Sequence, residues 1–486
     1  MPRPQVHLLN DPQRGPTLEA VVSRMKNSRD LCHGDSQQLI RCLAISATIP
    51  NADDIGEWLG SEGGPAVTHK LAESLRPVRL RRVVLGYPCP DKWSHFRFDL
   101  SLNYKLAAVL HTYSDQKPAL VFCSTRKGCQ QAAAVLVKEA RFVSGAEHKV
   151  RLTRVANLVT DGGVRELLLR GVGVHHAGLA PHDRHCVEQL FLDGDLPVLF
   201  CTSTLAMGVN LPAHLVVVKS TSHYTADGCG PYSDAEVLQM TGRAGRPQFE
   251  TSATAVIMTQ VQHRSRYEAL LSGTQLTESW LHLHLIAHLN AEVVLGTVTD
   301  VEVALRWLRS TFLYVRALRN PTHYGLPPGL PRRQVEDRLQ DLCMVELNRL
   351  AAAGLISKGE VEVSATPSGR LMARFCISFQ TMQTLQQMSG TEDLSALLAV
   401  LSACGEFEGI QLRTSDKRAL NALNRDPHRS CVRYPLPGRV KTTQMKVNVL
   451  VQSVLGSLPI ADPSLSQDAN KIFRVAERVM RSRCCS

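Results

Sequence analysis

The chain has 486 residues, of which 44% are hydrophobic and 20% are charged, so it can build about three domains and is not a disordered tail. Lys and Arg number 55 against 44 Asp and Glu, a net charge of +11. Residues 411–486 hold fourteen of these bases and only five of the acids, which predicts a local basic surface for an anionic partner.

Three classes of protein do not fit the sequence. The N-terminus has no apolar run behind basic residues, so it is not typical of a signal peptide. The longest apolar stretch, 196–218, contains polar residues that indicate two buried strands and a loop, and we expect no membrane span. The fourteen cysteines form no C-x-x-C pair, and the histidines and cysteine of 175–186 match no common zinc module, so we expect no metal site.

The predicted elements change character along the chain. Residues 39–45 predict a strand and DDIGEWLG a helix, which together are too small to fold alone. From 117 to 259, four apolar strands (119–123, 198–201, 215–220 and 254–258) alternate with helical segments (129–140 and 184–194), which predicts a parallel sheet covered on both faces.

The second half of the chain is mostly helical. Residues 281–295, 300–318 and 335–356 each carry a helical apolar period, and short strands are predicted within 357–375. Helices followed by a small β-wing indicate a winged-helix domain. From about 378 the chain is helical again, apart from a polar loop predicted at 424–443.

Four loops carry groups suited to phosphate. They are Ser46-Ala47-Thr48, Cys123-Ser124-Thr125-Arg126, Thr202–Asn210 and the segment Gln239–Arg246, which reads QMTGRAGR. The first three are also compatible with ordinary strand-to-helix loops. The fourth is more specific, because two glycines bring two guanidinium groups close together and a planar fork suits a triphosphate.

In this order and spacing, SATIPN, VFCSTRK, HHAGL, TSTLAMGVNLPA and QMTGRAGRPQF resemble the later motifs of superfamily 2 helicases of the superkiller-like group. Within that group the chain most resembles the meiotic crossover-promoting DNA helicases. The resemblance implies a RecA-like α/β motor domain with a parallel sheet, followed by winged-helix and all-α domains. It places the end of a first motor domain at 1–75, a second motor domain at 76–265, the winged helix at 266–364 and a truncated helical domain at 365–486.

The resemblance also implies roles for individual residues. Gln239, Arg243 and Arg246 would be catalytic, with the arginines reaching the γ-phosphate. Gly208, Asn210 and Gly242 would bind the nucleotide, while Ser46 and Thr48 would couple nucleotide state to movement. The nucleic acid would be contacted by Ser124, Thr125, Arg126, His176, Thr204, Tyr224, Lys471, Arg474 and Arg478.

Two of these assignments rest on local patterns. Residues 218–234 place Tyr224 and Tyr232 around a Gly-rich tip, which predicts a β-hairpin, the strand-separating pin in the family; an ordinary loop is the alternative. Lys471, Arg474 and Arg478 share one helix face opposite Ile472, Val475 and Val479, and this helix is expected to end near SRCCS. Such a face is either a DNA contact or simply solvated.

The sequence departs from the family at its start. The phosphate loop G-x-x-x-x-G-K-[ST] is not present, and Pro4 and Gln5 replace the two acids of the Asp-Glu-x-His box, which would hold Mg²⁺ and activate water. The family's cofactors are ATP and Mg²⁺, but we expect this N-terminally truncated chain not to hydrolyse ATP alone. We expect a nuclear helicase acting on single-stranded or branched DNA with meiotic recombination proteins; the alternatives are a non-catalytic DNA-binding fragment or an RNA helicase.

Overall fold

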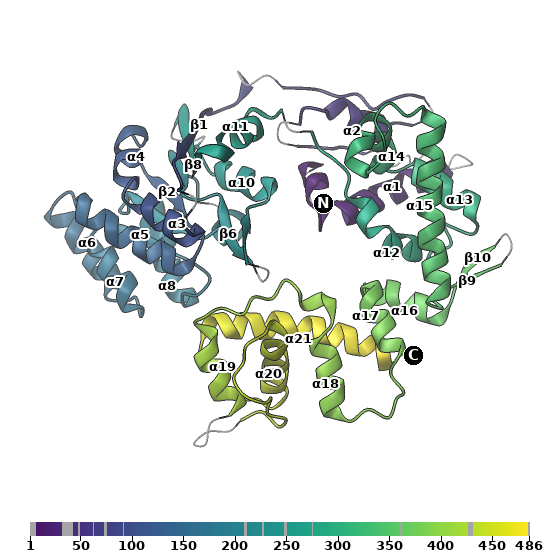
Figure 1. The fold of residues 1–486 in the computed structure, drawn as a ribbon. Helices are drawn as coiled ribbons and strands as arrows, with labels where there is room; N and C mark the ends of the chain where they lie inside the picture. The colour runs from purple at the N-terminus through teal and green to yellow at the C-terminus, as the bar shows by residue number, and fades with distance from the viewer. Residues whose placement is uncertain are drawn as a thin grey trace. The chain divides into compact units, whose positions relative to one another are not determined.

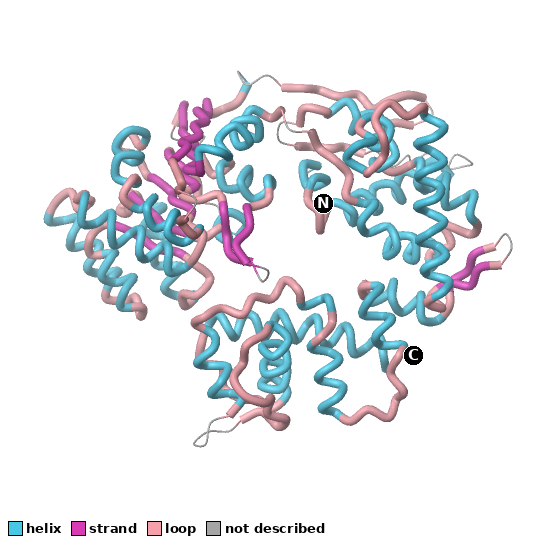
Figure 2. The backbone as a smooth tube through the Cα atoms, viewed as in Figure 1, coloured by secondary structure: helices cyan, strands magenta, loops and turns pink. Residues whose placement is uncertain are grey.

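The computed structural model describes residues 6–31, 42–46, 49–61, 63–71, 75–90, 92–208, 211–225, 228–246, 250–274, 276–359, 362–425 and 431–484. The chain forms two compact units. We call residues 71–274 with 461–464 the sheet unit, and residues 1–70, 275–460 and 465–486 the helical unit. Figure 1 shows their elements and Figure 2 shows where strands and helices concentrate along the backbone.

The sheet unit is built around six parallel strands. In spatial order they are β1 (Arg79–Tyr87), β8 (Ser252–Gln260), β5 (Leu215–Val218), β2 (Ala119–Phe122), β4 (Val198–Cys201) and β3 (Val172–His175). Every residue of β2, β3, β4 and β5 is buried, as expected for apolar runs that helices cover. The four predicted strands are therefore confirmed, and so is the parallel sheet.

Helices pack against this sheet along the whole unit. They are α3 (His95–Asn103), α4 (Leu106–Tyr113), α5 (Arg126–Glu139), α6 (Ala146–Ala156), α7 (Gly162–Leu168), α8 (Pro181–Leu192), α9 (Thr204–Gly208), α10 (Asp234–Thr241) and α11 (Arg264–Ser272). After β5, the strands β6 (Ser222–Thr225) and β7 (Gly228–Pro231) pair antiparallel, which confirms the predicted hairpin.

The helical unit contains the expected winged helix. Its elements are α12 (Leu281–Val294), α13 (Val301–Arg309), α14 (Phe312–Arg319), η4 (Pro321–Tyr324), α15 (Arg332–Ala352), β9 (Ile356–Lys358), β10 (Val363–Ala365) and α16 (Pro367–Phe375). Two expectations are corrected. The segment 300–318 is two helices, because the Thr311 hydroxyl caps a new helix by accepting from the Tyr314 N–H. Residues 367–375 are helix and not strand, because Thr366 caps a helix that starts at Pro367.

The rest of the helical unit is α17 (Phe379–Gln386), α18 (Leu394–Ser402), η5 (Gly405–Phe407), α19 (Asp416–Asn424), α20 (Thr443–Leu455) and α21 (Pro463–Cys484). Residues 431–442 contain no helix or strand, which confirms that part of the predicted loop. The last helix runs to Cys484, within the segment SRCCS near which it was expected to end. Val479 and Ser482 are both buried, and this packing maintains the helix where the apolar period fades.

The N-terminal segment packs onto the winged-helix part of the same unit. Its elements η1 (Val6–Asn10), α1 (Gly15–Leu31) and α2 (Ala52–Leu59) share a core in which Trp58 contacts Phe312, with ring centroids 5.5 Å apart. The predicted strand at 39–45 is not formed over 42–46, where Leu43 is 75% exposed; residues 39–41 lie outside the described residues. Ile45 occupies a single β-bridge position and its carbonyl accepts the Val6 N–H at 3.4 Å, but residues 42–46 join none of the sheets in the part of the chain that the structure describes.

One buried carboxyl group joins α1 to two winged-helix segments. Glu19 is fully buried, and its two carboxyl oxygens accept hydrogen bonds from the Ser279 hydroxyl (2.6 Å) and the Leu313 backbone N–H (2.7 Å). Burial raises the pKa of Glu19 from 4.5 to about 7, against the opposing effect of these hydrogen bonds. The group is therefore neutral in the folded protein at mildly acidic pH and must ionise inside the core at higher pH.

This buried carboxyl group predicts a pH-dependent stability. Below pH 4.5 Glu19 is protonated in both states, between pH 4.5 and about 7 only the unfolded chain ionises it, and above pH 7 the folded protein ionises it too, inside its core. The folded state therefore loses up to about 3 kcal/mol as pH rises through that window. We expect the melting temperature of the native chain to fall relative to that of Glu19→Gln between pH 5 and pH 8. The exposed Glu57, which pairs with Arg319 at 3.0 Å, supplies the control Glu57→Gln; parallel pH profiles for native chain and Glu19→Gln would contradict the prediction.

Candidate functional site

Two of the four predicted phosphate loops and the loop that carries His176 meet at one edge of the sheet. Ser124 follows β2, His176 follows β3 and Thr202 follows β4, and these strands are neighbours. Because the strands are parallel, their carboxyl ends lie at the same edge. The Thr202 N–H donates to the His175 carbonyl at 3.4 Å, which ties two of the loops together. The predicted nucleic-acid residues of these loops are thus brought to one place.

The loop after β2 is organised by its own hydroxyl groups. The Thr125 side chain caps α5 by accepting the Gly128 N–H at 2.9 Å, and the Ser124 hydroxyl donates to Asp99 at 3.4 Å. The Ser124 proton is therefore directed inward to a carboxylate. What this loop offers to an anion is the amino-terminal end of a 14-residue helix and the side chain of Arg126, the first residue of that helix.

His176 adds a neutral ring to this edge. Burial, and secondly the positive charge of Arg126, lower its pKa from 6.5 to about 4. At neutral pH the imidazole therefore carries no charge and acts as a hydrogen-bonding group. Thr204, at the start of α9, shares a hydrogen bond of 2.9 Å with the Thr202 hydroxyl, so it also lies at this edge.

A buried lysine supports the same edge, and the sequence analysis missed it. Lys219 follows β5 directly and is fully buried; its ammonium donates to the Asp99 carboxylate at 3.0 Å and to the Asn103 side-chain oxygen at 2.6 Å. The other oxygen of Asp99 is the acceptor for Ser124. One carboxylate thus joins the loop after β2 to the root of the hairpin. A lysine immediately after four apolar strand residues was the signal that a buried counter-ion was needed.

The hairpin is anchored by an aromatic pair at its base. His223 stacks on Tyr232 with ring centroids 4.5 Å apart, and Tyr232 is only 3% exposed. Tyr232 is therefore a core residue and does not flank an exposed tip. Tyr224 lies in β6, but its side chain lies outside the described part of the structure, so its predicted contact with a base stays a prediction.

The arginine loop lies at the opposite edge. It follows α10, which starts with a capping box of Ser233 and Glu236 and contains Gln239. Ala244 forms a bridge with Ala213, just before β5 begins. This loop therefore meets the amino ends of β5 and β8, whereas the three loops above meet carboxyl ends.

Both arginines of this loop point to oxygen acceptors. The Arg243 guanidinium donates to the Ala206 carbonyl, with Nε at 3.2 Å, and Arg246 donates to Glu250 at 2.6 and 3.1 Å. Between them, Gly245 has φ +107°, and an added Cβ would lie 2.9 Å from Val78, so this turn needs glycine. Gly242 ends α10 in a helical conformation. Glu250, whose side chain is 2% exposed, was not identified from the sequence.

One segment connects the two edges. Residues 202–214 leave β4 at its carboxyl end and enter β5 at its amino end, passing through α9. The carbonyl of Ala206 in α9 accepts a hydrogen bond from Arg243, and the Thr202 N–H donates to the His175 carbonyl. Gly208 ends α9, and Asn210 lies outside the described residues. The segment predicted to bind nucleotide and nucleic acid therefore does touch both groups of loops.

The coupling residues are not tested by this geometry. Ser46 is exposed in the helical unit, and Thr48 lies outside the described residues. In α21, Lys471 and Arg474 are exposed and Arg478 is half-buried, opposite the buried Ile472 and Val479. The predicted division of this helix into a basic and an apolar face is confirmed, while its contact with DNA stays a prediction.

Part of the C-terminal positive charge is used inside the helical unit. Lys446 is fully buried and donates to Asp416 at 2.6 Å and to Asp468 at 2.7 Å. Arg413 also donates to Asp468, at 2.8 Å. Two of the fourteen bases therefore stabilise α19, α20 and α21 against one another and are not offered to a partner.

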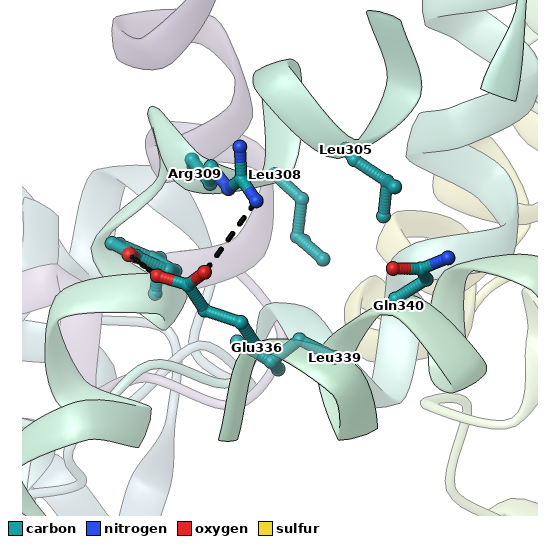
Figure 3. Close-up of a pocket in the computed structure, with 7 residues that line it drawn as sticks. Leu305, Leu308, Arg309, Glu336, Leu339 and Gln340 are labelled. Atoms are coloured by element: carbon teal, nitrogen blue, oxygen red, sulfur yellow. Dashed lines mark hydrogen bonds and ion pairs between the residues drawn. The ribbon is translucent and has the colours of Figure 1, made fainter. Parts of the chain in front are cut away.

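The cavity drawn in Figure 3 is too small for a ligand. It lies between α13 and α15, where Arg309 and Glu336 approach to 3.5 Å and Leu305, Leu308 and Leu339 line the cavity. Its volume of about 20 Å³ holds one water molecule. Within the described ranges, no three His, Cys, Asp or Glu side chains are grouped to hold a metal ion, and no helix is long and apolar enough to cross a bilayer.

Three family models match separate parts of the chain. They are the helicase conserved C-terminal domain at residues 163–248, a winged helix-turn-helix domain at 278–358 and the Sec63 Brl domain at 365–484. Their order agrees with the sheet, winged helix and helical region described above, so the predicted fold class is confirmed.

Named relatives match nearly the whole chain. A probable ATP-dependent DNA helicase HFM1 from Xenopus tropicalis is 52% identical over 98% of the chain and 36% of the relative. Its counterpart from Homo sapiens is 53% identical over 98% and 34%, and ATP-dependent DNA helicase MER3 from Saccharomyces cerevisiae is 35% identical over 98% and 40%. The chain thus spans well under half of each relative. By these matches, the chain is a homologue of the HFM1/MER3 group of ATP-dependent DNA helicases.

Proposed function

We propose that this chain supplies the second motor domain, the winged helix and the helical domain of an ATP-dependent 3′-to-5′ DNA helicase. It would act in the nucleus, in meiotic recombination and crossover formation, on single-stranded or branched DNA and beside recombination proteins. The observation that supports the proposal is that two different groups of side chains lie at the two edges of one parallel sheet. Guanidinium groups gather at its amino edge, while a helix start, hydroxyls and Arg126 gather at its carboxyl edge.

The groups at the amino edge suit ATP. Arg243 and Arg246 already donate to a carbonyl and a carboxylate, and phosphate oxygens are acceptors of the same kind. ATP with Mg²⁺ supplies the transferable phosphoryl group, and the two arginines would stabilise its charge. Gln239, Gly242, Gly208 and Asn210 would line this side. For Mg²⁺ the chain has no matching ligand, because Pro4 and Gln5 stand where the family has two acids.

The carboxyl edge suits a nucleic-acid backbone. The start of α5 and Arg126 offer donors to phosphate oxygens, and such contacts fix position without reading bases. The hairpin rises from the same edge, because it follows β5. The stacked rings of His223 and Tyr232, where the hairpin leaves the sheet, would be a rigid support for a strand-separating tip.

Two other functions remain distinct hypotheses. The chain alone would be a non-catalytic DNA-binding protein if no first motor domain joins it. An RNA helicase is favoured by a 32% identical relative from Arabidopsis thaliana, the DExH-box ATP-dependent RNA helicase DExH14. Affinities for DNA and RNA strands of one sequence, measured on this chain, separate these hypotheses, since only a 2′-OH contact would favour RNA.

The first prediction from the proposed function concerns the hydrolysis of ATP. The 486-residue chain is expected to release no phosphate from ATP above background, with or without DNA, because the Mg²⁺ ligand, the general base and the phosphate loop are missing from its sequence. Steady-state phosphate release is the measurement, and a chain with Arg243→Ala and Arg246→Ala is the control. ATP turnover by the native chain that is lost in this double variant would contradict the prediction, because the chain would then hold a complete catalytic site.

The second prediction from the proposed function concerns the positive charge on the basic face of α21. Affinity for single-stranded DNA is expected to fall with log[salt] at a slope of roughly −0.7 per phosphate contacted. Lys471→Ala with Arg474→Ala should weaken binding and flatten the slope by about one to two contacts. Arg481→Ala is the control, because Arg481 pairs with Glu477 at 2.6 Å on the same helix. Point changes are used because deleting 411–486 would remove Lys446 and much of its core. Equal slopes would mean that this face of α21 is only solvated.

The third prediction separates the two edges. In a longer protein that adds a first motor domain, Arg246→Ala should lower ATP turnover by about 10³-fold or more while DNA affinity stays nearly unchanged. Arg246→Lys keeps a partner for the buried Glu250 but loses the planar fork, so it should show the same loss in a stable fold. Lys471→Ala should instead weaken DNA binding with turnover at saturating DNA retained. Equal losses of DNA affinity for Arg246→Ala and Lys471→Ala would mean that the two surfaces are wrongly assigned.

A further inference from the structure

The loop after β3 touches the side chain of Arg126 at a glycine. A Cβ added to Gly178 would lie 2.7 Å from the Arg126 Nη1, 3.1 Å from its Cδ and 3.2 Å from its Cζ. The guanidinium end of Arg126 therefore lies across the backbone of Gly178. These two residues come from the loops after β2 and β3, which the sheet brings to one edge.

The backbone does not explain why position 178 is glycine. Gly178 does not have the left-handed φ of Gly171 or Gly245, at +79° and +107°, so an L-residue fits its conformation without strain. The three heavy atoms nearest to such a Cβ all belong to the outer part of one flexible side chain, that of Arg126. Chain geometry alone would therefore accept alanine, and what alanine would change is the place of the Arg126 guanidinium.

We propose that Gly178 is a positioning residue. Because it has no side chain, the Arg126 guanidinium can lie against its backbone, a place that we call the seat of Arg126. From this place Arg126 is directed to a backbone phosphate of single-stranded nucleic acid. This inference rests on the proposed function for the identity of the ligand, but not for the contact itself. A long side chain held in its bound orientation loses less conformational entropy when it meets a phosphate. Arg126 is also the first residue of α5, so the seat places its charge beside the amino-terminal amides of that helix.

The pKa of the His176 imidazole depends on where the Arg126 guanidinium lies. Burial lowers the pKa of His176 most, the charge of Arg126 lowers it further, a backbone hydrogen bond and the charge of Asp161 raise it, and the charge of His175 lowers it. If Arg126 leaves its seat, the second effect weakens while burial persists. The pKa of His176 should then rise from about 4, and nuclear magnetic resonance of labelled histidine follows this change without any ligand.

The binding experiment uses the 486-residue chain and a fluorescent dT oligonucleotide at several salt concentrations. Gly178→Ala is expected to weaken binding about tenfold, the size of one charge-assisted phosphate contact. Arg126→Ala should lose as much, and the double variant no more than Arg126→Ala, because both changes remove one contact. Gly162→Ala is the matched control, since Gly162 begins α7 and has no atom within 4 Å of an added Cβ.

The outcomes separate this inference from the proposed function. Native affinity in Gly178→Ala, or additive losses in the double variant, would overturn the positioning role. An unchanged pKa of His176 in Gly178→Ala would also overturn it, because Arg126 would not have moved. If the native chain binds no single strand while the His176 pKa still rises in Gly178→Ala, the proposed function fails and the seat for Arg126 stands.

Discussion

The six strands of the central sheet all run in the same direction, and this constraint decides where the loops at its two edges can lie. A parallel strand can be followed only by a connection that returns across the height of the sheet. Loops that follow strands therefore collect at one edge, and loops that precede strands collect at the other. The arginine loop follows a helix and precedes β8, so it is placed away from Ser124, Arg126 and His176 although all belong to one small domain.

Two connections keep these separated edges in contact. The segment 202–214 has its ends at opposite edges, and α10 leads from the hairpin to the arginine loop. Arg243, in the loop just after α10, donates to the carbonyl of Ala206 in α9, and this hydrogen bond joins the two connections. Arg243 is therefore linked to the segment that follows β4 by a hydrogen bond to its backbone.

The elements with strong local signals were predictable from the sequence. The apolar runs at β2, β4, β5 and β8 identify the sheet core, and the loops after β2 and β4 stand next to the expected strands, whereas the strand expected before Ser46 is not formed over 42–46. β1 was missed because three of the nine residues of RLRRVVLGY are arginines, as suits an edge strand, and β3 because VGVH is short and contains glycine. Partners distant in the chain were also missed: Asp99 lies 120 residues from Lys219, and no local pattern reveals which carboxylate a buried lysine will meet.

The buried carboxyl group of Glu19 has a consequence for the exchange of amide hydrogens with solvent. The Leu313 N–H donates to a residue 294 positions away in the chain, so this hydrogen exchanges only when α1 and α14 separate. Local fraying of α14 would not release it. Slow exchange at this single amide would therefore measure the free energy with which residues 6–59 and the winged helix open as one cooperative unit, and fast exchange would mean that the two segments fold and unfold independently.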